Sequence, residues 1–137
     1  MDHQLTTSLA HYRHARKVND LLFLAGQGCR EPSTNQCVGL TRNPDGAIKS
    51  YDIVLQTKGV FKNIERVLST FQLERQHLVD VTVFLTDMKD FDQMNNVWNE
   101  FFANCEPPAR TTVAVKQLPG ENFIEMKATA AFPETNS

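Results

Sequence analysis

The chain of 137 residues lacks the features of several large classes of protein. Its longest apolar stretch, residues 21–26, is far shorter than the roughly 20 residues that span a bilayer. Residues 1–4 do not show the basic and then apolar pattern of a secretory signal. The formal net charge of −2 gives no electrostatic reason to bind nucleic acid or an anionic membrane. We therefore expect neither as a partner.

Cysteine is also scarce. Cys29, Cys37 and Cys105 are odd in number and form no CxxC pair, which is untypical of a disulfide framework. They favour a reducing compartment, and we expect the protein in the cytoplasm. The cysteines lack the spacing of a zinc site, and the four histidines form no pair four residues apart on a helix. No metal site is expected.

The common catalytic motifs are missing as well. HExxH, GxSxG, a Walker loop and GxGxxG do not occur. The chain does contain 41% hydrophobic and 22% charged residues, which is an ordinary balance for a folded protein. It has the usual length of one domain and no repeat or linker. We interpret residues 1–137 as a single domain whose core covers about residues 12–132.

The first third of the chain is predicted to be mostly extended. Two runs, residues 12–18 and 21–25, are separated by a turn and predict a β-hairpin. Residues 28–44 are rich in Gly, Pro, Ser, Thr and Asn, and predict a long loop with at most one short strand near residues 37–40. Another short extended piece is expected at residues 47–49.

Two amphipathic helices are predicted. The first follows a cap at Ser50 or Asp52, and its apolar stripe consists of Val60, Ile64, Val67, Leu68 and Phe71. The second begins at Asp90, where Asp90 and Gln93 have the spacing of a capping box. Its stripe consists of Phe91, Met94, Val97, Trp98, Phe101 and Phe102.

Residues 78–86, 111–115 and 123–131 are predicted to be strands. Alternation in the first of them places four residues on one side, namely Val79, Val81, Val83 and Leu85. The order β-β-(β)-α-β-α-β-β indicates an α+β fold in which two helices cover one face of the sheet. Because the other face would stay uncovered, we expect a homo-oligomer.

Two charged residues are candidates for chemistry. Arg110 follows the stiff Pro107-Pro108 pair at the start of a strand, which suits capture of a carboxylate by a planar guanidinium of fixed aim. The alternative is a surface arginine at a strand edge. Glu125 is an acid in an otherwise apolar strand and could act as a general base for water if burial raises its pKa. The alternative is a solvent-facing residue or a partner for Lys127.

These features occur together in a pattern that resembles the RidA (YjgF) family of enamine/imine deaminases. The resemblance covers about residues 12–132 and rests on residues 22–27, 56–68, 81–91, 95, 101–102, 108–110 and 118–119. It implies a chorismate-mutase-like α+β fold that assembles as a homotrimer with three sites at the subunit interfaces. It also implies that Arg110 binds the substrate carboxylate, that Glu125 positions or activates water, and that Tyr12 lines the pocket. The matching Asp90, Phe91 and Asn95 are expected to be structural.

Departures from the family pattern indicate a specialised subgroup. Thr112 stands where relatives often have cysteine, and Ala25 stands where they often have serine. Many relatives have Gly-Pro-Tyr where this chain has residues 10–12, Ala-His-Tyr. Residues 12–17 are similar to those of 2-aminomuconate deaminases. Thr112 and Gln27 are further candidates to bind substrate.

The substrate of that subgroup is an enamine with a carboxylate at each end. Protonation at carbon gives the imine, water adds, and ammonia leaves, so no cofactor is needed. Strand alternation places His14 and Arg16 on the side of Tyr12, where a cation suits the second carboxylate, and Arg30 is the next candidate. The alternative is a solvated basic edge strand. Two other functions stay open, a broad-specificity enamine/imine deaminase and a chaperone-like protein that is not an enzyme.

Overall fold

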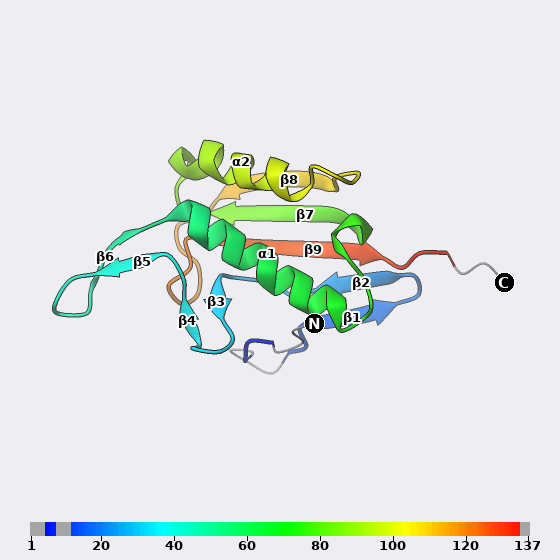
Figure 1. Ribbon diagram of the computed structural model, residues 1–137, viewed down its shortest axis with the longest axis horizontal. Helices are drawn as coiled ribbons and strands as arrows, with labels where there is room; N and C mark the ends of the chain where they lie inside the picture. The colour runs from blue at the N-terminus through cyan, green and yellow to red at the C-terminus, as the bar shows by residue number, and fades with distance from the viewer. Residues whose placement is uncertain (1–4, 8–11, 135–137) are drawn as a thin grey trace.

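The chain forms a five-stranded sheet that is covered on one face by two helices (Figure 1). The computed structural model describes residues 5–7 and 12–134. In the order in which they lie side by side, the strands are β1 (Ala15–Val18), β2 (Leu21–Leu24), β9 (Ile124–Ala131), β7 (Leu78–Leu85) and β8 (Ala109–Ala114). All neighbours are antiparallel except β7 and β8. The predicted α+β architecture is confirmed.

The predicted hairpin at the start of the sheet is also confirmed. β1 and β2 pair from Ala15 opposite Leu24 to Val18 opposite Leu21. Asn19 in the turn has φ of 53°, a conformation that asparagine tolerates better than most residues. Along β2 the side chains alternate, because Leu22 and Leu24 are buried whereas Phe23 is 41% exposed.

The connection from β2 to the first helix is more ordered than predicted. It contains two small hairpins, formed by β3 (Arg30–Glu31) with β4 (Gln36–Cys37) and by β5 (Leu40–Arg42) with β6 (Ile48–Tyr51). The prediction of a loop with at most one short strand is therefore wrong. β3, β4 and β5 have only two or three residues each, which is too short to show alternation, and the many turn residues of this segment indicated a loop. The short extended piece predicted at residues 47–49 is confirmed as part of β6.

Helix α1 (Ile53–Ser69) begins where the sequence predicts. The Asp52 side chain caps it by accepting a hydrogen bond from the Leu55 N–H at 3.1 Å. The apolar stripe is buried against the sheet from Val60 to Leu68. No helix in the described ranges is long and apolar enough to cross a membrane.

Helix α2 (Phe91–Phe101) lacks the predicted capping box. Asp90 makes no capping hydrogen bond and instead accepts one from the Tyr51 hydroxyl at 2.7 Å. A 3₁₀ turn, η2 (Met88–Asp90), precedes the helix, and Asp87 caps that turn. A second such turn, η1 (Arg75–His77), leads into β7. The spacing of Asp90 and Gln93 predicted the wrong role because the Asp90 carboxylate accepts a hydrogen bond from Tyr51, which is distant in the sequence, and does not cap the helix.

The alternation predicted for β7 is correct except at its start. The register shifts between Leu78 and Asp80, so Leu78 is 2% exposed and Val79 is 44% exposed. The following residues, Val81, Val83 and Leu85, face the helices and are fully buried.

The second face of the sheet is covered by no element of the described chain (Figure 1). Large apolar side chains are exposed on it, namely Val18, Leu21, Phe23 and Val113, which are 37 to 47% exposed. We call this surface the open face. Its composition is that of an interaction surface.

Candidate functional site

A cavity of about 130 Å³ lies where the chain leaves β2, beside the start of β9. Five segments that are distant in the sequence contribute to its wall. Of the eight site residues predicted from the sequence, five line it, namely Tyr12, His14, Gln27, Arg30 and Glu125. The structure thus brings together most of the predicted site residues around one cavity.

Glu125 reaches the pocket from β9. It pairs with Phe84 and therefore lies on the side of the sheet away from the helices, whereas its neighbours Ile124 and Met126 are buried in the core. The side chain is half-buried, and the loss of water raises the pKa of its carboxyl group. A Cβ atom at Gly26 would collide with Glu125 Oε1, so the glycine makes room for the carboxylate.

Lys127 does not neutralise Glu125. The Lys127 Nζ atom donates to the Leu24 carbonyl at 3.0 Å, and no ion pair joins the two side chains. The sequence left open that Glu125 serves only as a partner for Lys127, and the geometry does not favour that role. A half-buried carboxylate without a cation is suited to accept a proton.

Gln27 and His14 form a second polar group in the pocket. Gln27 is 3% exposed, and its Nε2 atom donates to the Ala25 carbonyl at 3.0 Å and lies 3.5 Å from His14 Nδ1. His14 Nε2 donates to the Thr6 carbonyl at 2.5 Å, so that Nδ1 is the ring nitrogen that faces Gln27. The Arg30 guanidinium donates to the Thr7 carbonyl. Residues 6 and 7 therefore lie against the pocket.

Asn63 and Asn122 also line the pocket, and neither was predicted. Asn63 is 4% exposed on α1, and its Nδ2 atom donates to the Gly28 and Arg30 carbonyls at 2.9 and 2.8 Å. A polar residue within the apolar stripe beside Val60 and Ile64 was a signal that could have identified it. Asn122 lies in a loop, and no local pattern pointed to it.

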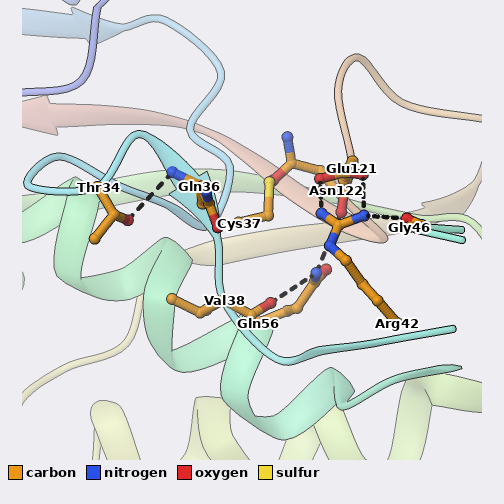
Figure 2. A network of polar contacts seen from close by, with 9 residues as sticks. All are labelled: Thr34, Gln36, Cys37, Val38, Arg42, Gly46, Gln56, Glu121 and Asn122. Carbon is orange, nitrogen blue, oxygen red and sulfur yellow. Dashed lines mark hydrogen bonds and ion pairs between the residues drawn. The ribbon is translucent and has the colours of Figure 1, made fainter. Parts of the chain in front are cut away.

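A polar network holds that loop against the rest of the chain (Figure 2). Gln56 is fully buried; its Nε2 donates to the carbonyls of Val38 and Glu121 at 3.1 and 3.3 Å, and its Oε1 accepts from the Phe123 N–H at 2.8 Å. Arg42 donates to both carboxylate oxygens of Glu121 at 2.5 and 3.0 Å and so holds the pKa of that carboxyl below its usual value. The network places Asn122 at the pocket.

Arg110 lies elsewhere. It pairs with Val81 and so faces α2, where its Nη1 atom donates to Asn95 Oδ1 at 2.8 Å and its guanidinium lies 4.8 Å from the centre of the Trp98 ring. The loss of water lowers its pKa. Within residues 5–7 and 12–134 no carboxylate pairs with it. It is not a freely solvated arginine at a strand edge.

Thr112 shares this side of β8. It pairs with Val83, and its hydroxyl oxygen is buried without a hydrogen-bond partner in the described part of the chain. A buried hydroxyl without a partner costs free energy. Thr112 and Arg110 thus share the helix side of β8, and the Thr112 hydroxyl is a polar group without a partner there.

One chain does not bring Arg110 to Glu125. The two residues face opposite sides of the sheet and belong to strands that are separated by β7. Arg16 does not line the pocket either, since it is exposed and pairs with Phe23 on the open face. Nor do the described residues contain a group of three or more His, Cys, Asp or Glu side chains that could hold a metal ion.

Known proteins are similar to this chain in sequence and in fold. Residues 3–132 match the family model described as Endoribonuclease L-PSP. A RutC family protein of Pyrococcus abyssi is 39% identical over 119 residues, which are 87% of this chain and 84% of that protein. Protein HMF1 of Saccharomyces cerevisiae is 35% identical over 122 residues, which are 89% of this chain and 84% of that protein.

Among solved structures, the Rid family protein YyfA of Yersinia pestis, whose function is described as unknown, superposes with a TM-score of 0.83. It is 27% identical, and the match covers 96% of this chain and 95% of that one. The extent of these matches and the shared arrangement of two helices on one sheet leave one assignment. The chain belongs to the Endoribonuclease L-PSP family, also called the RidA (YjgF/RutC) family.

Proposed function

We propose that the protein hydrolytically deaminates a carboxylate-bearing enamine or imine without a cofactor. The observation that carries the proposal is Glu125, a half-buried carboxylate with a raised pKa in a pocket that also contains Gln27 and His14. A carboxyl group of raised pKa accepts a proton from water more readily than a solvated one does. Membership of a family that includes imine deaminases supports the same chemistry.

The carboxylate anchor in this proposal is Arg110 of a neighbouring subunit. Within one chain Arg110 is partly desolvated, has no carboxylate partner among the described residues, and stands on the edge strand β8. A second copy that covers the open face would place its edge strand beside the pocket of the first copy. In a closed homotrimer this contact occurs three times and gives three equivalent sites.

The reaction follows from these two groups. The Arg110 guanidinium binds the carboxylate next to the imine carbon and draws electron density from that carbon. Glu125 takes a proton from water as the water oxygen bonds to the carbon, and passes it to the nitrogen, which receives the electrons of the C=N double bond, so that a carbinolamine forms. Glu125 then moves the proton of the new hydroxyl group to the amino group. The C–N bond breaks, ammonia leaves, and the C–O bond becomes the carbonyl of a 2-oxo acid.

Within this class we propose 2-aminomuconate, an enamine with two carboxylates, as the substrate. Arg30 lines the pocket together with Glu125 and is the candidate for the distant carboxylate, whereas Arg16 lies outside the pocket. Arg30 now donates to the neutral Thr7 carbonyl. A carboxylate would replace that acceptor by a charged one and form a stronger hydrogen bond.

Ammonia release from an enamine generated in situ tests the catalytic pair. We expect Arg110→Ala to lose binding and rate together, by several kcal/mol in kcat/KM if the site excludes water. Glu125→Gln keeps the shape of the side chain but removes the base, so kcat should fall while KM changes little. A kcat for Glu125→Gln close to that of the unmodified protein would place the base elsewhere.

A comparison of two arginines tests the substrate. Arg30→Ala should weaken turnover of 2-aminomuconate by roughly 1.5 kcal/mol or more in kcat/KM and leave turnover of 2-aminoacrylate nearly unchanged, because only the first has a second carboxylate. Arg16→Ala is the matched control and should affect neither substrate. Equal losses on both substrates for Arg30→Ala would instead support a broad-specificity deaminase. No turnover of either substrate would support a chaperone-like protein that is not an enzyme.

A further inference from the structure

Two cysteines lie close together at the base of the β3–β4 hairpin, and one of them, Cys37, lines the pocket. Cys29 donates to Asn122 Oδ1 through its backbone N–H at 2.8 Å and through its thiol at 3.2 Å. The Cys37 thiol lies 3.6 Å from the same oxygen atom. Cys37 pairs with Arg30, the residue next to Cys29, so the two cysteines are diagonal neighbours across the hairpin. Both sulfur atoms therefore converge on one carboxamide (Figure 2 shows Cys37 beside Asn122).

The two thiols differ in access. Cys37 lines the pocket, whereas Cys29 is 1% exposed and does not line it. Cys29 instead borders a separate cavity beside α1, where a Cβ added at Gly59 would lie 3.1 Å from Cys29 Cβ. A small molecule that enters the pocket can therefore meet Cys37 first. The third cysteine, Cys105, lines a separate cavity with Arg75 and Phe101.

The surroundings of Cys37 favour its thiolate, which is the reactive form. Polar contact with the neighbouring Cys29 thiol is the main cause that lowers the pKa of Cys37 to about 7, and the nearby Arg30 acts in the same direction. The same contact and burial raise the pKa of Cys29. Of the two thiols, Cys37 therefore loses its proton first, and Cys29 is the protonated thiol beside it.

We propose that Cys29 and Cys37 are a site of reversible oxidation, at which hydrogen peroxide converts the two thiols to a disulfide. The Cys37 thiolate attacks one peroxide oxygen, the O–O bond breaks, and the leaving hydroxide takes up a proton to become water. Cys37 is then a sulfenic acid. The Cys29 sulfur, as its proton leaves, attacks the Cys37 sulfur and expels the second water. The two thiols lose two electrons, and the hydrogen peroxide is reduced to two molecules of water.

The product would alter the pocket wall. The disulfide has no S–H group, so Asn122 Oδ1 would keep only the Cys29 backbone N–H as a donor. The three free thiols of the structure correspond to the reduced state. This oxidation does not depend on the proposed deaminase activity, since its chemistry uses no catalytic group of that proposal.

The test is a titration of the reduced, full-length protein with hydrogen peroxide, followed by thiol alkylation and peptide mass mapping. We expect one equivalent of peroxide to consume two thiols, to join the peptides that contain Cys29 and Cys37 within one chain, and to leave Cys105 free. Dithiothreitol should restore all three thiols. The rate should rise as the pH increases through about 7, because the thiolate fraction of Cys37 increases.

Three substitutions separate the roles of the cysteines. Cys29→Ser should stop the reaction at a Cys37 sulfenic acid, which dimedone traps. Cys37→Ser should react with hydrogen peroxide at no more than about one tenth of the rate of the unmodified protein. Cys105→Ser should react at the same rate as the unmodified protein. Circular dichroism identifies a variant that does not fold. Peptide mass mapping of the oxidised, unmodified protein shows whether the Cys29–Cys37 disulfide forms, and this result needs no variant. The proposal would be overturned by a Cys105 that reacts as fast as Cys37, by a cross-link between chains, or by a stable dimedone adduct on Cys37 with no disulfide.

Discussion

At the scale of single residues, the raised pKa of Glu125 in the pocket makes the free energy of unfolding depend on pH. Its pKa is raised because burial disfavours the charged carboxylate, so the folded protein binds the proton more tightly than the unfolded chain does. The stabilising contribution of the protonated form is fully present below the unfolded pKa. It is lost as the pH rises through the raised pKa of the folded state.

Glu125→Gln should therefore be more stable than the unmodified protein at pH 7 to 8, because glutamine does not ionise. At a pH near 4 the difference should disappear, because Glu125 is then protonated in the folded protein. Melting temperatures measured across this range at one protein concentration check the prediction. Glu106→Gln, at an exposed position, is the control. A difference that does not change with pH would contradict the cause given for the raised pKa.

At the scale of elements, Gln56 joins α1 to the loop that carries Asn122. Its side chain satisfies three backbone groups, namely the Val38 and Glu121 carbonyls and the Phe123 N–H. In Gln56→Leu the new side chain is similar in size, but it cannot form hydrogen bonds with these three backbone groups. Since each buried polar group left unpaired costs about 1–3 kcal/mol, we expect a loss of about 2–4 kcal/mol in the free energy of unfolding.

Urea unfolding followed by the fluorescence of Trp98 measures this loss, at a fixed protein concentration because subunit association also contributes to stability. Gln93→Leu on α2 is the matched control, since Gln93 is exposed, and it should change stability by less than about 0.5 kcal/mol. Equal stability of the two variants would show that the network in Figure 2 does not hold the loop.

At the scale of the whole molecule, the open face and the separation of Arg110 from Glu125 lead to one prediction. Phe23→Asp places a charge on the open face and should convert a trimer into species with the 15.5 kDa mass of one chain, as measured by light scattering. Leu55→Asp is the control, because Leu55 is 49% exposed on α1, away from that face. A monomer before any substitution would remove the basis for a shared site.

A mixture of two inactive variants tests the shared site directly. If each site takes Arg110 from one subunit and Glu125 from the next, Arg110→Ala and Glu125→Gln chains can combine to form intact sites. Random assembly of equal amounts makes about a quarter of the sites intact. Unfolding and refolding the two variants together should therefore restore about a quarter of the activity. No recovery in a mixture that forms trimers would place both residues in the same subunit's site.

The amino-acid sequence by itself determined the elements that depend on local forces. The β1–β2 hairpin, the stripe of α1 from Val60 to Leu68 and the Asp52 cap follow from periodicity and capping within a few residues. The family assignment also came from the sequence, because its motifs extend over nearly the whole chain. Local forces also indicated the extended piece at residues 47–49, which overlaps β6, but not the separate strands β3, β4 and β5 of two or three residues.

The tertiary structure alone decided which of the candidate residues share a space. The face of the sheet on which a side chain lies depends on strand register, and a sequence does not state which residues pair. Because Arg110 pairs with Val81 and Glu125 pairs with Phe84, the two candidates for catalysis lie on opposite faces. For the same reason the cysteines, which have no motif spacing along the chain, converge on Asn122 only through contacts between residues 85 to 93 positions apart.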